Sequence, residues 1–273
     1  MAPLSATRLV IPVPPTLDRW ALEEDDVPET VLHERVIGLL LAIFNAWIVR
    51  ASRDALAGSN LALRFDAAQP QRGVDPDVYL VEPAPPEGER TTSLRLWEAG
   101  HHPPRVAVEV VSESTARKDY DLEDGPARYA AAGVKELWVF DPLLLGPNTA
   151  GGPWVLQVWR RSPKGSFRRV YQGAGPAYSR ELRAWLVVTD GGTRLRLAED
   201  AAGKRLWPTL EEEERAAKER ERAAKERERA AKERERAAKE RERAAKEEER
   251  SRREAAEAEV ARLRALLAGR DGG

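Results

Sequence analysis

Two acidic residues interrupt segments that otherwise have the pattern of buried β-strands. Asp77 lies in residues 74–81 (VDPDVYLV), and Glu109 lies in residues 105–114 (RVAVEVVSES). Taking an unpaired carboxylate out of water is costly, because the charge loses its hydration. Two such acids on neighbouring strands therefore predict a shared stabilising partner, and a divalent metal ion bound by both carboxylates is the simplest one.

Each acid also has a structural interpretation. Asp77 follows Pro76, and this pair is common in turns. Glu109 could instead form a buried ion pair with Arg105 or Lys118, and a structural protein with such a pair would not be stabilised by metal ions. The residues alone leave both interpretations open.

The other polar residues near the acids fit turns and caps better than catalysis. Ser112, Ser114 and Thr115 follow the second acidic segment, and the nearest histidines in the sequence are the His101-His102 pair. A hydroxyl needs an adjacent base to become a nucleophile, so we interpret the three as turn and helix-cap residues. The histidine pair is interpreted as part of a loop rather than a metal site.

A helix is predicted to begin near residue 29. Thr30 is suited to cap its N-terminus, and its apolar residues recur at three- and four-residue spacing. They are Val31, Leu32, Ile37, Leu40, Leu41, Phe44 and Ile48. The lone His33 in the first turn is interpreted as solvent-facing or satisfied in the core, rather than catalytic.

A strand, a helix and a second strand are predicted around Glu109. Residues 105–112 are almost continuously apolar, which predicts a central strand covered on both faces. A helix is predicted from about residue 117 to residue 132, and residues 135–142 form the next strand, ending in a turn capped by Asp141. This order predicts parallel strands and a right-handed crossover. Further strands are predicted at residues 61–65, 154–161, 167–172, 183–188 and 193–197.

Composition limits the class of protein. The net charge of −1 gives no global reason to expect steering towards nucleic acid or an anionic membrane. The absence of cysteine excludes disulfides and thiolate metal sites. Residues 1–22 lack the pattern of a signal peptide, and the longest apolar run, residues 36–49, is shorter than a bilayer span. We therefore expect a cytoplasmic protein without membrane association.

The order and spacing of these motifs resemble those of the Uma2 (DUF820) family. The resemblance covers roughly residues 29–200, and His33 near the start of an apolar helix also fits it. It implies a restriction-endonuclease-like α/β fold with a mixed β-sheet flanked by helices, and hydrolysis of DNA with Mg²⁺ or Mn²⁺. The motifs that carry it are Pro76-Asp77, Val108-Glu109-Val110-Val111-Ser112, Ser114-Thr115, Lys118-Asp119, Tyr129, Gly133-Val134, Glu136-Leu137-Trp138 and Asp141-Pro142.

The resemblance assigns the metal to Asp77 and Glu109. Two carboxylates suit Mg²⁺, which keeps several waters and takes other ligands from a phosphate. The carbonyl of Val111 could supply a further ligand, since alternate residues of a strand point the same way.

A nuclease of this kind also needs a cation near the scissile phosphate. The family pattern places a lysine either two residues after Glu109 or four residues before Tyr129, and these positions hold Val111 and Gly125. The nearest substitutes are Lys118 and Arg128, with Arg117 a weaker one.

The C-terminal segment has a different composition. A seven-residue unit, Glu-Arg-Ala-Ala-Lys-Glu-Arg, repeats from Glu214 to about Lys246. Its adjacent alanines do not supply the apolar spacing of a coiled coil, but its opposite charges four residues apart stabilise an isolated helix. A helix over residues 211–268 would span on the order of 90 Å at about 1.5 Å per residue. We interpret it as a rigid spacer with a weakly dimerising, coiled-coil tip, formed by Val260, Leu263, Leu266 and Leu267.

Together these observations predict three parts: an arm at residues 1–28, a restriction-endonuclease-like domain at residues 29–207 and a long charged helix at residues 208–273. The predicted function is metal-dependent DNA cleavage. The alternative is an inactive nuclease fold that binds nucleic acid or acts as a scaffold through its helix.

Overall fold

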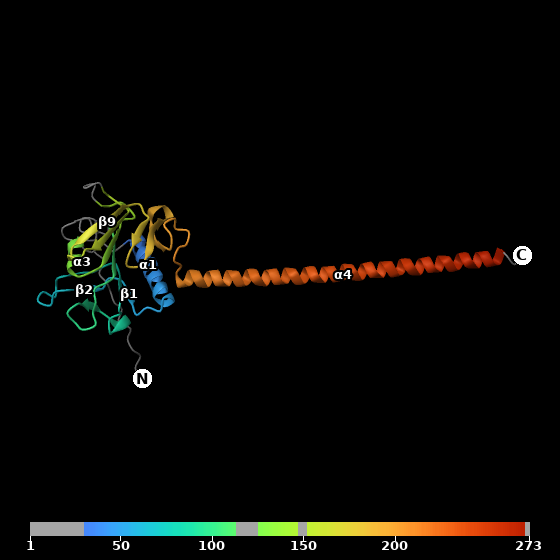
Figure 1. Cartoon of the computed structure of the whole chain (residues 1–273), viewed down its shortest axis with the longest axis horizontal. Helices are drawn as coiled ribbons and strands as arrows, with labels where there is room; N and C mark the ends of the chain where they lie inside the picture. Colours follow the sequence, from blue (N-terminus) through green and yellow to red (C-terminus); the bar gives the residue numbers. More distant parts are fainter. Residues whose placement is uncertain (1–29, 113–124, 147–151, 271–273) are drawn as a thin grey trace, which may run out of the picture. The chain divides into compact units, whose positions relative to one another are not determined.

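The computed structural model describes residues 30–112, 125–146 and 152–270 (Figure 1). The chain separates into two compact units, with the division between Leu210 and Glu211. The predicted N-terminal arm lies outside the described residues. The predicted domain boundaries at residues 28 and 207 stay predictions.

Helix α1 (Val31–Arg50) is the central helix of the first unit. Thr30 caps it as predicted, because its hydroxyl accepts a hydrogen bond of 3.2 Å from the backbone N–H of His33. Its buried stripe packs with residues of two different sheets, and the ring of Phe44 meets Trp138 edge-on at 5.9 Å. By length and composition alone α1 could cross a membrane. The expectation that this segment is too short was therefore wrong, and burial between sheets accounts for its apolar character.

The main sheet is mixed and has six strands. Strands β6 and β7 are parallel, as predicted, and all other neighbours are antiparallel. The mixed α/β fold class is confirmed. In spatial order the strands are β1 (Leu56–Gly58), β4 (Val78–Val81), β6 (Val106–Val110), β7 (Glu136–Phe140), β8 (Leu156–Arg161) and β9 (Phe167–Gly173).

Strand β6 is covered on both faces, as its apolar sequence predicts. Val106, Val108 and Val110 belong to the cluster around α1. Ala107 lies on the other face, in a second cluster that includes Tyr129 of helix α3 (Gly125–Ala131). Side chains alternate along a strand, so Glu109 shares the face of Ala107.

The structure describes helix α3 from Gly125 onward, and this part agrees with the predicted helix and its predicted end. The helix was predicted to begin near residue 117, but residues 113–124 lie outside the described residues. Pro126 lies in the first described turn of α3, where a missing N–H costs nothing. Gly133 follows the helix at φ +79°, and a Cβ there would lie 2.9 Å from Pro103, so glycine is required.

The strand predicted over residues 74–81 is broken. It forms β3 (Gly73–Val74) and β4, with Asp75, Pro76 and Asp77 between them. Pro76 has no N–H for a ladder and restricts the residue before it. Asp77 therefore lies at the entrance to a strand, not inside one, and the sequence interpretation is corrected on this point.

Two small sheets complete the first unit. Strand β2 (Ala62–Arg64) lies between β3 and β5 (Ser93–Arg95), and the β11 (Ala184–Thr189) strand lies between β10 (Ala177–Ser179) and β12 (Arg194–Ala198). The sequence analysis did not predict β1, β5 and β10, each of three residues. Short 3-10 turns occur at Gly88–Arg90 and Asp190–Gly192.

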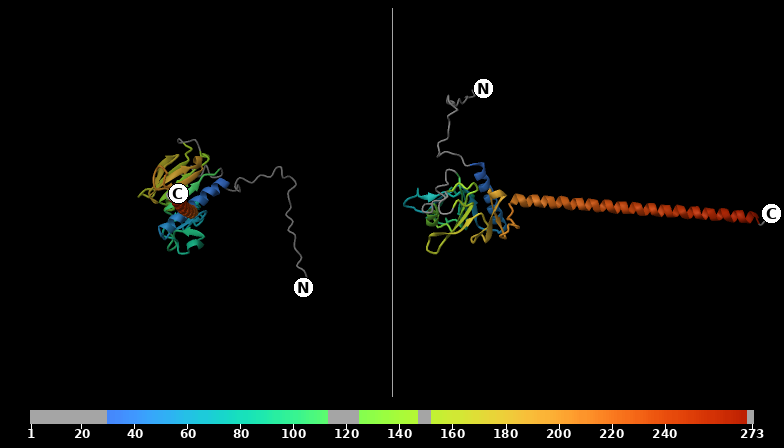
Figure 2. Two further views of the ribbon diagram at one scale, coloured as in Figure 1. Left: turned by 90° about the vertical axis from the view of Figure 1, so that its right-hand side faces the viewer. Right: turned by 90° about the horizontal axis from the view of Figure 1, so that it is seen from above.

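The second unit is the single helix α4, which the structure assigns to Leu210–Arg270 (Figure 2). Its side chains are exposed over almost all of residues 210–262. Lysine and glutamate four residues apart pair at 2.5–2.6 Å in five successive repeats. The predicted charge-paired helix is confirmed. The side chains of residues 263–270, which include most of the predicted coiled-coil tip, lie outside the described ones.

Candidate metal centre

The carboxylate of Asp77 is tied to strand β6 and to α1. Its Oδ2 accepts a hydrogen bond of 2.6 Å from the backbone N–H of Val110 and lies 3.2 Å from Nε2 of His33. The same Nε2 lies 2.9 Å from the Val110 carbonyl. A carbonyl and a carboxylate only accept, so we assign the proton of His33 to Nε2, where it is shared between Asp77 and Val110.

Strand register brings Glu109 next to Asp77. Val78 pairs with Val108 in the antiparallel ladder of β4 and β6, and one residue further along this register Asp77 is opposite Glu109. Such partners have Cα atoms about 4.5–5.5 Å apart. The phenol of Tyr129 donates a hydrogen bond to Oε1 of Glu109, which is half-buried. The acids are therefore held by side chains from two helices that cover opposite faces of the sheet, His33 of α1 and Tyr129 of α3.

The two oxygens of Asp77 have different surroundings. Oδ2 has both hydrogen-bond contacts, whereas within the described residues Oδ1 has none. An oxygen in this state can coordinate a cation without losing a protein partner. The acids thus suit a Mg²⁺ ion, which is commonly held by one or two carboxylates with waters and phosphate oxygens completing the octahedron. No group of three or more His, Cys, Asp or Glu side chains that could hold a metal occurs among the described residues.

The structure places Val111, the remaining predicted ligand, and only one of the predicted cations, Arg128. Val111 follows β6 directly, and its N–H donates to the Phe140 carbonyl at 2.8 Å. It therefore continues the strand past Glu109, and the use of its own carbonyl as a ligand stays a prediction. The Arg128 guanidinium donates to the carbonyl of Gly73, in the segment that leads to Asp77. Lys118 and Arg117 lie outside the described residues.

His33 is a site residue that the sequence analysis did not select. The side chain is 4% exposed, so the core-satisfied interpretation is correct and the solvent-facing one is wrong. Its contact with Asp77 adds a role as an anchor of the proposed ligand. A signal was present, because His33 precedes Val36, Ile37 and Leu40 at helical spacing and so belongs to the buried stripe of α1.

Other polar residues match their structural interpretations. Asp141 caps a turn, since its carboxylate accepts from the N–H groups of Leu145 and Gly146 at 2.9 and 3.0 Å. His101 lies in a loop, where Nδ1 accepts from the Arg95 N–H at 3.0 Å and Nε2 lies 3.1 Å from Glu87.

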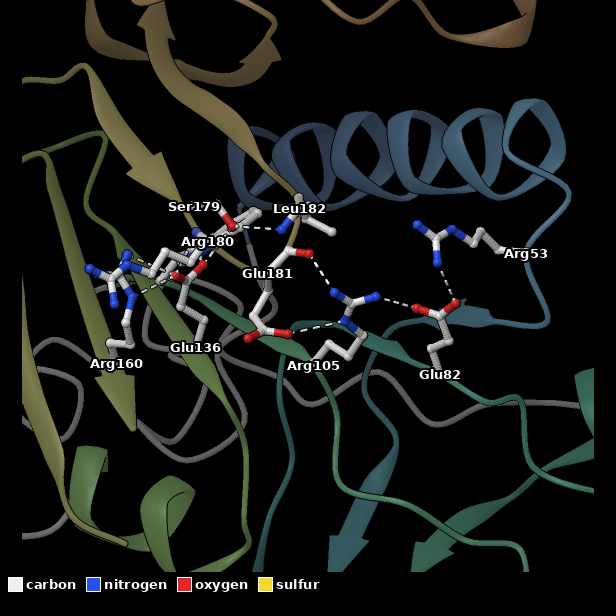
Figure 3. A network of polar contacts seen from close by, with 10 residues as sticks. Arg53, Glu82, Arg105, Glu136, Arg160, Ser179, Arg180, Glu181 and Leu182 are labelled. Carbon is white, nitrogen blue, oxygen red and sulfur yellow. Dashed lines mark hydrogen bonds and ion pairs between the residues drawn. The ribbon is translucent and has the colours of Figure 1, made fainter. Parts of the chain in front are cut away.

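The buried charges at the other end of β6 and β7 form a separate network (Figure 3). Arg105 pairs with Glu82 and Glu181, so the proposed ion pair between Arg105 and Glu109 is wrong. Burial by itself would raise the pKa of Glu82, but hydrogen bonds and charges from Arg105 and Arg53 outweigh it and hold that pKa below its ordinary value.

Glu136 is the most deeply buried acid of this network, at 0% exposure. Its carboxylate accepts hydrogen bonds from four donors: Arg160, the Trp138 ring N–H, the Ser179 hydroxyl and the Arg180 backbone N–H, at 2.6–3.2 Å (Figure 3). A buried carboxylate with this many donors is satisfied without a metal. Glu136 therefore joins the main sheet to the segment that carries β10, and it is a structural residue.

Comparison with known proteins places the chain in a family. The sequence model of the Uma2 family, described as "Putative restriction endonuclease", matches residues 22–164, just over half of the chain. The chain belongs to the Uma2 family. The predicted resemblance is confirmed.

One solved structure from Anabaena variabilis, titled "a putative nuclease belonging to DUF820", is similar to this chain. The sequences are 14% identical, the match covers 57% of this chain and 75% of the other, and the TM-score is 0.38. No curated protein matches the chain.

Proposed function

We propose that the protein is a Mg²⁺- or Mn²⁺-dependent endonuclease that hydrolyses phosphodiester bonds of DNA. The observation that carries the proposal is the register that sets Asp77 opposite Glu109, with Oδ1 of Asp77 without a protein partner among the described residues. Membership of a family described as restriction endonucleases supports it.

In this proposal the residues of the chain position the ligands before substrate binds. Asp77 would bind the ion through Oδ1, while His33 and the Val110 N–H hold Oδ2. Glu109 would bind it with the carboxylate that Tyr129 orients. A divalent ion bound there would polarise the phosphoryl oxygen and lower the pKa of the attacking water. Arg128 or Lys118 would supply the cation that the family pattern expects.

Plasmid cleavage in Mg²⁺ or Mn²⁺ tests the function. We expect Asp77→Asn and Glu109→Gln to abolish cleavage. Asp75→Asn is the matched control, because Asp75 lies two residues earlier, pairs with Arg64 and has a side chain 60% exposed. Equal cleavage by all four proteins would refute the assignment of the site.

Metal binding gives a readout that does not depend on cleavage. Mn²⁺ at about one hundred times its dissociation constant should stabilise the wild-type fold by about 2.7 kcal/mol. Thermal unfolding with and without Mn²⁺ measures this shift, which Asp77→Asn should remove and Asp75→Asn should retain. A shift of equal size in the wild type and Asp77→Asn would place the ion elsewhere.

A second candidate is an inactive nuclease fold that binds nucleic acid or acts as a scaffold through α4. It is favoured by the absence of lysine at Val111 and Gly125, and by the engagement of Arg128 with Gly73. DNA binding without cleavage in either metal would support it.

We also propose a cytoplasmic location without membrane association, and homo-oligomerisation through the end of α4. Sedimentation should show a monomer when Leu263 and Leu267 are both changed to Lys.

A further inference from the structure

A second cluster of polar and aromatic residues lies on the face of the main sheet that carries Glu109. Glu109 pairs with Val139 of β7, and Val139 pairs with Gln157 of β8. Residues directly opposite one another share a face of a sheet. Gln157 is therefore on the face of Glu109, two strands away, at about 10 Å between Cα atoms.

Gln157 is buried with one donor unused. The side chain is 1% exposed, and its Oε1 accepts a hydrogen bond of 3.2 Å from Nη1 of Arg169. An arginine can only donate, so this contact assigns Oε1 to the side of Arg169 and leaves Nε2 as the free donor. Among the described residues, Nε2 has no hydrogen-bond partner.

Trp159, two residues further along β8, is also buried with an unused hydrogen-bond donor. It is 8% exposed, and its ring N–H also has no hydrogen-bond partner within the described part of the chain. Side chains two residues apart on a strand share a face, so both unused donors lie on the face of Glu109. Buried donors in folded proteins nearly always have an acceptor, and two neighbouring exceptions indicate an acceptor that comes from outside the chain.

Arg169 adds a positive charge to these donors. It is opposite Trp159 in the ladder of β8 and β9, and its guanidinium carbon lies 4.4 Å from the centre of the Trp154 ring and 5.3 Å from that of Trp159. No carboxylate of the described residues pairs with it. Burial lowers the pKa of Arg169, as expected for a cation that is partly desolvated without an acid nearby.

The partly exposed Arg169 and the edge of Trp159 border solvent, and Gln157 is buried behind them. Trp159 lines a groove of about 390 Å³ between α3 and the β8–β9 hairpin, together with Pro126, Ala130, Ser166 and Phe167. A ligand in this groove would approach the face of the sheet that carries Glu109.

We propose that Gln157, Trp159 and Arg169 bind a phosphate group of the DNA backbone about three nucleotides from the scissile one. The three residues offer donors, whereas phosphate oxygens only accept. The distance of about 10 Å from Glu109 corresponds to about three nucleotides at about 3.4 Å of rise per strand. This inference rests on the proposed function, since it takes DNA as the ligand.

Fluorescence anisotropy of a labelled DNA duplex tests the site, with the full chain in EDTA so that cleavage cannot occur. We expect Arg169→Met to weaken binding about tenfold, and to reduce the slope of log K against log salt by about 0.9, as for the loss of one phosphate contact. Arg168→Met is the matched control, because Arg168 precedes Arg169 on β9 and is exposed; it should change neither quantity. Equal losses in both variants, or none in Arg169→Met, would overturn the inference.

Trp159→Phe is a second variant that does not remove the arginine. It keeps an aromatic ring in the core and deletes the N–H, so we expect the variant to fold, with a modest loss of stability from the smaller ring, and to bind DNA several-fold more weakly. Unchanged DNA binding by a folded Trp159→Phe variant would contradict the role of this donor.

Two further comparisons complete the test. The first asks whether the ligand is DNA, and the second distinguishes failure of the nuclease proposal from failure of the phosphate site. Inorganic phosphate should be titrated while tryptophan fluorescence is followed. If phosphate quenches the wild type but not Arg169→Met, and both proteins bind DNA equally, DNA is not the ligand. Tighter binding of an RNA duplex than of the DNA duplex would also reject DNA as the ligand. Arg169-dependent DNA binding without plasmid cleavage would refute the nuclease and support the phosphate site. Cleavage that is indifferent to Arg169, with unchanged DNA binding, would refute the phosphate site alone.

Discussion

Asp77 and Glu109 are each held by a side chain that comes from a different helix. His33 of α1 contacts Asp77, and Tyr129 of α3 donates to Glu109. Such contacts fix the orientation of a carboxylate. Such outer contacts are usually as important for a metal site as the ligands themselves.

Replacement of His33 by alanine should affect both stability and metal affinity. The change leaves the buried Val110 carbonyl and Oδ2 of Asp77 without the imidazole donor, so we expect a loss of about 1–3 kcal/mol in the free energy of unfolding. We also expect Mn²⁺ affinity to fall about 10- to 100-fold. Urea unfolding and Mn²⁺ titration measure the two effects. A variant with lower stability and wild-type Mn²⁺ affinity would show that His33 supports the fold alone.

At the scale of elements, strands β6 and β7 carry two polar centres at opposite ends. Arg105 and Glu136 lie at the start of these strands, and Glu109 lies towards the end of β6. The first centre is saturated: every acid in it has arginine partners. In the second, Asp77 contacts His33 and the backbone N–H of Val110, and Glu109 accepts a hydrogen bond from Tyr129.

The network of Arg105 should make the stability of the first unit depend on pH. The pKa of Glu82 is lower in the folded state than its ordinary value of 4.5. The unfolded state therefore binds more protons in this range, and the stabilisation is complete above about pH 4.5 and lost as pH falls through the folded pKa. Glu82→Gln should flatten this part of the curve, measured by urea unfolding between neutral and acidic pH.

Glu98→Gln is the control for this prediction, because Glu98 pairs with Arg95 on the surface, with side chains 38% and 50% exposed. Exposed pairs contribute little to stability, so its curve should follow the wild type. An unchanged pH dependence in Glu82→Gln would show that other groups control acid unfolding.

At the scale of the whole molecule, α4 differs from the first unit in what stabilises it. The described part of α4 contains nine pairs of opposite charge four residues apart. At about 0.2–0.5 kcal/mol each they contribute roughly 2–4.5 kcal/mol. The first unit depends instead on two buried apolar clusters.

The two units should therefore respond differently to salt and heat. High salt screens exposed charges, so we expect it to lower the helical circular dichroism signal of α4 while the cooperative melting of the first unit keeps its temperature. Circular dichroism at 222 nm and near-ultraviolet signals from the tryptophans follow the units separately, since the eight tryptophans all precede α4. A single cooperative transition seen by both signals would contradict independent stabilisation.

Much of the fold follows from local patterns in the sequence. The period of α1, the apolar run of β6 and the charge repeat of α4 each determine their element, because neighbours along the chain supply the relevant contacts. The same patterns single out Asp77 and Glu109 as acids in apolar surroundings. The family motifs add the order of the elements and the expected chemistry.

Only the tertiary structure decided which side chains meet. His33 and Asp77 are 44 residues apart and Glu109 and Tyr129 are 20 apart, and no local period encodes such contacts. The register of β4 against β6, and the break at Pro76, set Asp77 opposite Glu109. The Gln157–Trp159–Arg169 cluster also requires the pairing of β8 with β9. Sequence determined the candidates and their chemistry, whereas strand pairing and burial determined their partners, because these depend on contacts between distant parts of the chain.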